Sequence, residues 1–286
     1  MDPFRERAPG DLTALRQFGA RVPIQDSSAA VGMSNANRHD FDELPVVLLH
    51  GTSGRSEDWS QVVEQLASHR SVIRPNYGEP VAGAVCVPGV SDFADRAVAV
   101  ARAGGRDRFD LVGYSLGAAV ATFIAAEYPG MVRSLVLVSG FSYGDDPRMR
   151  LQFDLWLRLA RTDKIALGKL LLASGLSREF LSAFDENTVN GIIESFVAMS
   201  DWPLIEQSIR VDLAVDVREQ AKKIKAPTLS IAGKYDQIVP SFYTQELADL
   251  IPTAKKAEIH SGHLSFLEKP ADLASAMLTF LFERHP

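Results

Sequence analysis

Short aliphatic runs alternate with helix-like patterns along most of this chain. The strand-like runs are residues 45–49, 109–112, 135–138, 228–231 and 257–259. Between them, apolar residues recur at helical spacing, as they do at Leu273, Met277, Phe280 and Leu281. Strands that alternate with helices and are apolar on both faces predict an α/β fold, with a parallel sheet flanked by helices.

The alternation stops between residues 141 and 220, where the patterns are helical only. Three apolar stripes occur there: Leu151, Leu155 and Leu159; Ile192, Ile193, Phe196 and Val197; and Trp202, Ile205 and Ile209. Such a segment predicts an insertion between two strands, near the sheet edge where ligands bind. We expect residues 141–220 to form a helical cap, or lid, over a core of residues 1–140 and 221–286. The alternative is that the insertion only adds packing surface.

The N-terminal segment has a weaker pattern. Residues 16–25 are compatible with an edge strand. Residues 27–40 are rich in Ser, Asn and Ala, which favours a loop or the tip of a hairpin.

Composition and charge narrow the function classes. The 286 residues are 46% hydrophobic and 23% charged, with a net charge of -6. We find no basic stripe that would favour nucleic acid, and no apolar stretch of about 18 residues that would cross a membrane. The charged N-terminus lacks the apolar segment of a signal peptide, so we expect a cytoplasmic protein. The single cysteine, Cys86, permits no disulfide within the chain, and we expect a loop or packing role for it.

A candidate nucleophile follows the strand-like run 109–112. Residues 113–117 read Gly-Tyr-Ser-Leu-Gly and are followed by an alanine-rich helical pattern. In the motif Gly-x-Ser-x-Gly, a sharp turn between strand and helix exposes the serine hydroxyl, and the glycines avoid collisions with neighbouring backbone. We therefore expect Ser115 to be the nucleophile, although a capping serine at a helix start would look similar.

Two backbone N–H groups are candidates for an oxyanion hole. The N–H of Leu116 begins the predicted helix, where backbone N–H groups have no intrahelical partner. Residues 49–54 form a polar, glycine-bearing turn after the first clear strand, and we expect the N–H of Thr52 to be the second donor. We expect His50 to hold this loop by hydrogen bonds rather than to act as a base.

Asp236 and His263 are the candidate acid and base. Asp236 follows the strand at 228–231, and His263 follows the short strand at 257–259. Histidine titrates near neutrality and can take the serine proton, while a carboxylate holds its other ring nitrogen. The chain order Ser115, Asp236, His263 is the order expected on such a sheet. His260 is the competing histidine, but its place within the strand favours a side chain that points away.

Other polar residues receive less specific interpretations. We expect Asp212 and Asp216 to belong to a solvated linker that leaves the cap. No metal-ligand cluster and no phosphate-binding glycine loop is evident, so we expect no metal and no cofactor. We expect a small-molecule substrate, and the sequence does not predict the oligomeric state.

Together, these blocks resemble the α/β-hydrolase superfamily, in particular its capped, esterase-like bacterial serine hydrolases. The resemblance runs from about residue 45 to residue 282 and is carried by residues 50–52, 113–117, 233–236 and 262–270. It implies a mostly parallel sheet of eight strands flanked by helices, with a helical lid between strands 6 and 7. It also implies oxyanion donors at Thr52 and Leu116. Ser115 at the elbow sets the chain apart from dehalogenases and epoxide hydrolases, which use aspartate there.

One loop departs from the pattern of these relatives. Where they usually carry an Asp-x-x-Gly-x-Gly-x-Ser-like segment, residues 74–80 have Asn76 in place of the aspartate and lack the second glycine and the serine. We expect hydrolysis of an ester, lactone or thioester of a moderately sized, largely apolar substrate. The alternatives are a carbon–carbon bond hydrolase, a non-hydrolytic lyase or cyclase, and a ligand-binding receptor without turnover.

Overall fold

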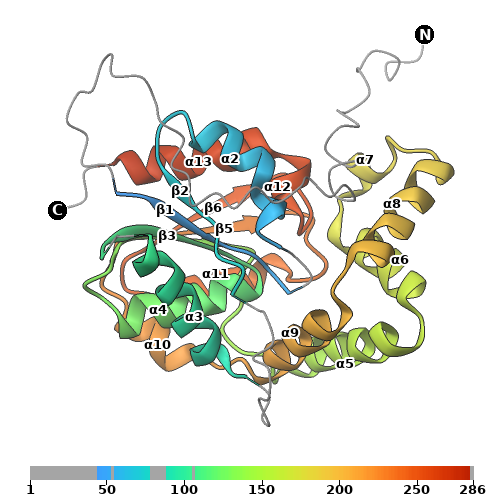
Figure 1. Ribbon diagram of the computed structural model, residues 1–286, viewed down its shortest axis with the longest axis horizontal. Coiled ribbons are helices and arrows are strands. Elements are labelled where there is room, and N and C mark those ends of the chain that lie inside the picture. Colours follow the sequence, from blue (N-terminus) through green and yellow to red (C-terminus); the bar gives the residue numbers. More distant parts are fainter. Residues whose placement is uncertain (1–43, 53–54, 78–87, 105–106, 284–286) are drawn as a thin grey trace.

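A parallel sheet of six strands forms the centre of the molecule (Figure 1). The computed structural model describes residues 44–52, 55–77, 88–104 and 107–283. The strands are β1 (Val46–Leu49), β2 (Val72–Ile73), β3 (Phe109–Tyr114), β4 (Val132–Val138), β5 (Thr228–Gly233) and β6 (Ala254–Ile259). Their order is β2-β1-β3-β4-β5-β6, and every neighbouring pair is parallel. The α/β prediction is therefore confirmed.

The predicted number of strands differs from this sheet. The described residues form six strands rather than eight. The edge strand expected at residues 16–25, the loop or hairpin tip expected at 27–40, and Cys86 all lie outside the described residues. The five strand-like runs of the sequence each fall on an observed strand.

Helices cover both faces of the sheet (Figure 1). The helices on one face are α3 (Val90–Ala103), α4 (Leu116–Glu127), α10 (Arg218–Lys223) and α11 (Ser241–Leu250). Those on the other face are α2 (Ser60–Leu66), α12 (Ser265–Glu268) and α13 (Pro270–Phe282), with the 3-10 helix η1 (Ser56–Trp59) preceding α2. Parallel strands require such crossover connections, and the helices bury the sheet on both sides.

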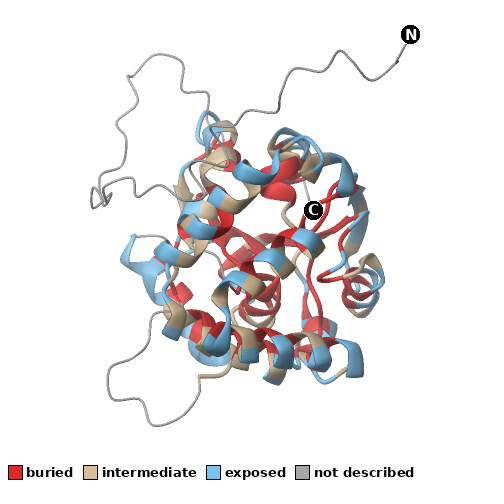
Figure 2. Cartoon of the chain, turned by 90° about the vertical axis from the view of Figure 1, so that its right-hand side faces the viewer, coloured by how far each residue is buried: buried red, intermediate tan, exposed pale blue. Residues whose placement is uncertain are grey.

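Two apolar cores result from the alternation of side chains along the strands. In β1, Val47 and Leu49 join the core under α3 and α4, whereas Val46 and Leu48 join the core under α2 and α13. Successive residues of a strand point to opposite faces, so a continuously apolar run fills both cores. Figure 2 shows this burial in the sheet and on the inward sides of the helices.

Six helices lie between β4 and β5 in the chain, and the first five, which precede α10, form a separate group. They are α5 (Pro147–Thr162), α6 (Lys164–Gly175), α7 (Arg178–Leu181), α8 (Glu186–Met199) and α9 (Trp202–Ala214). They stand beside the sheet rather than on either of its faces (Figure 1). We refer to α5–α9 as the helical insertion. Its position in the chain is the one expected from the interruption of the strand pattern.

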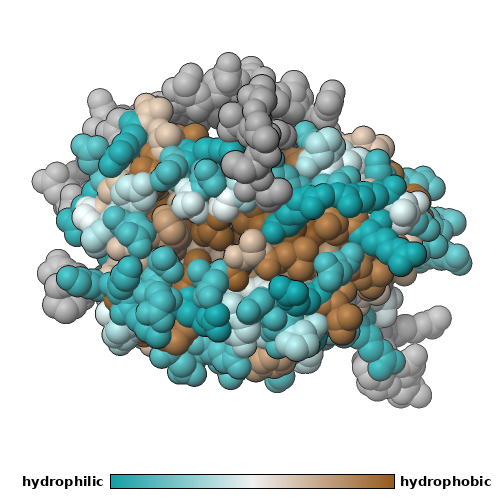
Figure 3. Space-filling model, turned by 90° about the horizontal axis from the view of Figure 1, so that it is seen from below, coloured by the Kyte–Doolittle hydropathy of each residue, from teal (hydrophilic) through white to brown (hydrophobic). Residues whose placement is uncertain are grey.

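The stripe predicted on α5 is wrong at two of its three leucines, since only Leu159 packs against the core. Leu151 is 75% exposed and Leu155 is 44% exposed. The helix instead buries Met149, Phe153, Trp156 and Ala160, which also recur at helical spacing. The aromatic stripe contacts the core, where Phe141 and Phe153 lie 5.9 Å apart between ring centroids. Figure 3, which views the molecule from the side of α5 and α9, shows apolar surface on this face.

A buried ion triad joins the middle of the sheet to its neighbours. Asp110 of β3 is fully buried and accepts hydrogen bonds from Arg70 and Arg133. The Nε atom of Arg133 lies 2.8 Å from Oδ1 of Asp110. The triad compensates a carboxylate that would otherwise be costly in the core.

None of the helices within the described ranges is long and apolar enough to span a membrane.

Candidate active site

Ser115 lies at the sharp turn between β3 and α4. Its backbone has φ 55° and ψ -121°, a left-handed conformation that non-glycine residues rarely adopt. A Cβ atom at Gly113 would collide with the carbonyl oxygen of Gly117, and one at Gly117 would lie 2.5 Å from the carbonyl oxygen of His50. The two glycines therefore permit the close approach of strand, turn and helix that the sequence motif predicts.

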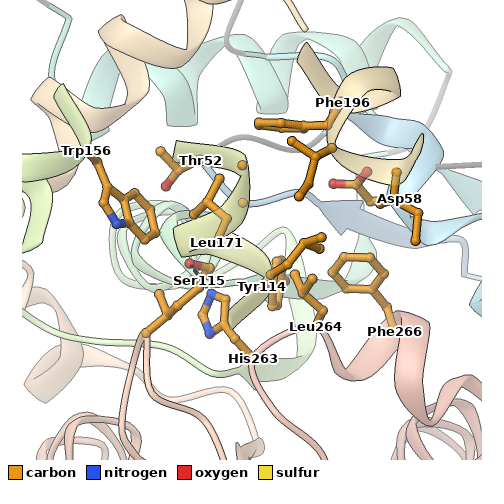
Figure 4. Close-up of a pocket in the computed structure, with 16 residues that line it drawn as sticks. Thr52, Asp58, Tyr114, Ser115, Trp156, Leu171, Phe196, His263, Leu264 and Phe266 are labelled. Atoms are coloured by element: carbon orange, nitrogen blue, oxygen red, sulfur yellow. Dashed lines mark hydrogen bonds between the residues drawn. The ribbon is translucent and has the colours of Figure 1, made fainter. Parts of the chain in front are cut away.

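The side chains of Ser115, His263 and Asp236 form a continuous hydrogen-bonded chain (Figure 4 shows the first two). His263 Nε2 lies 3.0 Å from Ser115 Oγ, and His263 Nδ1 lies 2.7 Å from Asp236 Oδ2. Asp236 follows β5 and His263 follows β6, so the carboxyl ends of neighbouring parallel strands bring them together. All three are at least 94% buried, with exposures of 6%, 4% and 6% for Ser115, His263 and Asp236.

The loop that holds Asp236 is rigidly hydrogen-bonded. Oδ1 of Asp236 accepts the backbone N–H groups of Ile238 at 2.9 Å and Val239 at 2.8 Å. Oδ2 is left to accept from Nδ1 of His263, an arrangement that directs the lone pair of Nε2 toward the serine hydroxyl. His260 is exposed, and its Nε2 lies 3.3 Å from Lys234 Nζ, away from this chain of hydrogen bonds.

Thr52 follows β1 and is buried beside the nucleophile. Its side chain donates a hydrogen bond from Oγ1 to Oδ2 of Asp212 at 2.7 Å. Asp212 lies in the last turn of α9, so this bond joins the helical insertion to the loop that follows β1. Thr52 lies in the turn after β1, and Leu116 is the first residue of α4. These two segments flank Ser115.

The prediction that Asp212 belongs to a solvated linker is wrong. Asp212 is fully buried, because α9 continues to Ala214 and places it on the inward side with Ser208 and Ile205. Burial raises the pKa of Asp212 well above the usual carboxyl value, and the hydrogen bond from Thr52 opposes this only in part. The helical spacing of Ile205, Ser208 and Asp212 is the sequence signal that would have identified the aspartate. Asp216 is exposed and pairs with Arg218.

His50 is fixed within the loop after β1. Its Nδ1 atom lies 2.9 Å from the carbonyl oxygen of Gly51, and its ring stacks on Tyr77 at 4.5 Å between centroids. Burial lowers the pKa of His50, which favours the neutral ring. The Tyr77 hydroxyl donates to the carbonyl oxygen of His50. Asn76, the residue that departs from the family pattern, accepts the backbone N–H of Ser56 at 3.0 Å and so holds η1.

An apolar pocket opens onto Ser115 and His263 (Figure 4). The helical insertion contributes Trp156 from α5, Leu171 from α6 and Phe196 from α8. The remaining apolar lining includes Leu172, Ile192, Ile193, Ile238, Leu264 and Phe266. Tyr114, next to the nucleophile, contacts the ring of His263, with 4.9 Å between the ring centroids and an angle of 45° between the ring planes. The pocket can therefore bind an apolar group next to the serine hydroxyl.

Asp58 is the one acidic residue on the lining of this pocket, among the described residues. Burial raises its pKa to about 7. The sequence alone does not reveal Asp58 as a lining residue, because a single aspartate in a short helical turn carries no spacing signal.

The part of the chain that the structure describes holds no group of three or more metal-binding side chains.

Comparison with known proteins agrees with this architecture. The profile of the alpha/beta hydrolase fold family matches residues 45–270. The chain is 39% identical over 241 residues to pyrrolizixenacetamide deacetylase of Xenorhabdus hominickii, which covers 82% of this chain and 90% of that protein. It is 30% identical over 276 residues to 2-hydroxymuconate semialdehyde hydrolase of Pseudomonas sp. strain CF600, which covers 86% of this chain and 90% of that protein.

The fold is also similar to that of solved structures. The enol-lactonase of Burkholderia xenovorans LB400 superimposes with a TM-score of 0.75 at 21% identity, over 86% of this chain and 94% of that chain. The family profile spans the strands, the elbow at Ser115 and the loops of Asp236 and His263. The chain belongs to the alpha/beta hydrolase fold family.

Proposed function

We propose that this protein is a serine hydrolase that cleaves an ester, lactone or thioester through an acyl-enzyme on Ser115. The observation that carries the proposal is the hydrogen-bonded chain from Ser115 through His263 to Asp236, with distances of 3.0 and 2.7 Å. A serine hydroxyl is a weak nucleophile until a neighbouring base accepts its proton. The names of the relatives, a deacetylase and a hydrolase, support hydrolysis as the general reaction.

In the first step, Oγ of Ser115 attacks the carbonyl carbon of the substrate while His263 Nε2 takes the hydroxyl proton. Asp236 accepts the Nδ1–H of the ring and stabilises the positive charge that develops on it. The tetrahedral intermediate then collapses, and the imidazolium gives its proton to the leaving oxygen or sulfur. The acyl group remains on Ser115.

The negative charge of the tetrahedral intermediate needs hydrogen-bond donors. We propose the backbone N–H groups of Thr52 and Leu116 for this role. Leu116 is the first residue of α4, where the N–H has no partner within the helix. In other enzymes, removal of one such donor lowers the stabilisation of the transition state by on the order of 3 kcal/mol.

In the second half of the reaction, water replaces the leaving group. His263 takes a proton from water as the oxygen attacks the acyl carbon, and then returns a proton to Oγ of Ser115. The products are the carboxylic acid and the free serine, so the cycle needs no cofactor.

We also propose that the helical insertion acts as a lid that selects the substrate. The wall of the pocket opposite the sheet comes from α5, α6 and α8 and is largely apolar. A moderately sized, apolar substrate therefore fits this site best. The corresponding domains are a core of residues 1–140 and 221–286 and a lid of residues 141–220.

Amide hydrolysis is a second candidate reaction. The relative with 39% identity is named a deacetylase of an acetamide. The same steps apply to an N-acetyl amide, with the imidazolium protonating a leaving amine in place of an alcohol.

The first experiment is labelling with a fluorophosphonate probe, followed by mass mapping of the modified residue. We expect the label on Ser115 in the wild-type protein and none in Ser115→Ala. His263→Ala should lower the labelling rate by orders of magnitude, because no base then activates the hydroxyl. Labelling of His263→Ala at the wild-type rate would contradict the proposal. Hydrolysis rates measured with ester, thioester and amide substrates separate the reaction classes.

A further inference from the structure

The pocket wall carries a carboxylate that the proposed reaction does not use. Asp58 lies in η1, just after the turn that holds Thr52. Besides Ser115, His263, Thr52 and Tyr114, the other lining side chains are apolar apart from Asp58. An isolated acidic group on an apolar wall is a selective feature, since it disfavours apolar ligands that leave it unpaired.

The carboxylate of Asp58 faces the open centre of the pocket. Figure 4 shows it on the side away from Trp156, with its oxygens directed inward and with Phe196 and Phe266 on the same side. A ligand group that extends from the scissile carbonyl at Ser115 along this side would reach the carboxylate.

The protein itself satisfies Asp58 only in part. Oδ2 accepts the backbone N–H of Arg55 at 3.2 Å, and no described residue donates a hydrogen bond to Oδ1. Burial is the largest influence on its pKa, which rises to about 7, and the nearby charge of Arg55 lowers it less than burial raises it. The ionised carboxylate is thus incompletely compensated, and a bound cation would compensate it.

The aromatic neighbours favour a cation as well. Phe196 and Phe266 line the pocket on the side of Asp58. Aromatic faces attract ammonium groups, and a carboxylate beside them adds a charge-assisted hydrogen bond. An anionic substrate group would meet repulsion at the same place.

We propose that Asp58 is a specificity-determining residue, which selects substrates that carry a protonated amine at the end remote from the scissile carbonyl. This inference rests on the proposed function, because it assigns the amine to a substrate that is acylating Ser115. It narrows the substrate class from apolar acyl compounds to apolar compounds with one basic nitrogen.

The test compares two series of p-nitrophenyl esters with the same number of heavy atoms. One series ends in an ammonium group and the other ends in a methyl group, over a ladder of chain lengths. At the length that spans the pocket, we expect wild-type kcat/KM to favour the ammonium ester by about tenfold or more. Asp58→Asn should reduce this preference ratio by about tenfold, and Asp58→Leu should reverse it.

Glu57→Gln is the matched control, because Glu57 is exposed on the same turn and its substitution removes the same charge. We expect the preference ratio of this variant to equal that of the wild type. A wild-type preference for the methyl series at every length would overturn the proposal. An ammonium preference that survives in Asp58→Asn would do the same.

Binding without turnover separates this inference from the proposed function. Calorimetric titration of Ser115→Ala with the same esters should show tighter binding of the ammonium member, and the Ser115→Ala, Asp58→Asn double variant should lose it. If Ser115→Ala binds the ammonium ester more tightly but the wild-type protein hydrolyses neither series, the proposed function is rejected and the role of Asp58 in binding is kept. Equal binding of both series by Ser115→Ala would reject the role of Asp58.

Discussion

Hydrogen bonds in this site determine which ring nitrogen of His263 carries the proton. Asp236 accepts from Nδ1 of His263, so Nε2 is the atom free to accept from Ser115. The two backbone donors to Oδ1, at Ile238 and Val239, fix the carboxylate in this orientation. The proposed catalysis therefore depends on Asp236 through the tautomer of His263.

Asp236→Asn tests this dependence. The amide can donate to Nδ1, which favours the tautomer with the proton on Nε2 and removes the base from Ser115. We expect kcat for an activated ester to fall by about a thousandfold or more, with KM changed much less. Steady-state kinetics measure both constants, and circular dichroism checks the fold. A loss of less than tenfold would show that Asp236 does not orient the base.

Asp212→Asn tests the buried carboxyl beside Thr52. Burial raises the pKa of Asp212, so the folded state binds this proton more tightly than the unfolded state does. The stability that the protonated Asp212 carboxyl contributes is fully present below its pKa in the unfolded state, near 3.8. This stability is lost as the pH rises through the pKa of the folded state. Asparagine still accepts from Thr52 and cannot ionise. At about pH 8 we expect the free energy of unfolding of Asp212→Asn to exceed that of the wild type by about 1 kcal/mol or more.

Urea unfolding across the pH range measures this effect, and the difference should vanish below the unfolded pKa. Asp216→Asn is the control, because its hydrogen bonds to Arg218 lower the pKa of the exposed Asp216 carboxyl. That variant should show no gain in stability at high pH. An Asp212→Asn protein less stable than the wild type at every pH would contradict the protonated state.

At the scale of elements, the helical insertion supplies one wall of the pocket and the sheet supplies the other. Phe196 of α8 lines the pocket, and its ring lies 5.7 Å from that of Trp202 of α9. The hydrogen bond between Thr52 and Asp212 ties α9 to the loop after β1. Any movement of the insertion is therefore linked to the segment that we propose to hold the oxyanion.

Phe196→Ala tests the role of the insertion in substrate selection. Removal of the ring takes apolar contact away from long acyl groups and leaves an acetyl group less affected. We expect the ratio of kcat/KM for octanoyl over acetyl esters to fall by about tenfold. Leu151→Ala, on the exposed side of α5, is the control and should keep the wild-type ratio. An unchanged ratio in Phe196→Ala would argue against the lid as a determinant of specificity.

At the scale of the whole molecule, stability depends on two apolar cores and on one charged cluster between strands. Asp110 of β3 is fully buried and binds Arg133 of β4 and Arg70, which precedes β2. Burial raises the pKa of Asp110, and the two arginines lower it. Removal of the carboxylate leaves Arg70, whose side chain is 4% exposed, without this anion.

Asp110→Ala should therefore lower the free energy of unfolding by about 3–5 kcal/mol, the usual cost of breaking a buried pair. Denaturant unfolding measures the change. Asp249→Ala removes an exposed partner of Lys256 and should cost no more than about 1 kcal/mol. Similar small losses in both variants would mean that the buried triad does not stabilise the protein.

Five of the six strands, all but β2, and the three polar residues at the ends of strands were predictable because both signals are local. A buried parallel strand is a continuous apolar run, and the elbow needs small residues at fixed distances from Ser115. Asp236 and His263 follow their strands directly, and the carboxyl ends of parallel strands meet at one edge. Local pattern and parallel topology together therefore pointed to three side chains that lie within hydrogen-bond distance of one another in the structure.

Tertiary structure alone decided which of two competing patterns is used and which distant residues meet. On α5 both the leucine stripe and the stripe of Phe153 and Trp156 have helical spacing, and packing against the core, which includes Phe141, selects the second. Asp212 meets Thr52 across 160 positions of sequence, and Asp58 faces the pocket because helices far along the chain complete its walls. Periodicity reports the neighbours of a residue along its own element, whereas its burial, its pKa and its partners depend on the elements that pack against it.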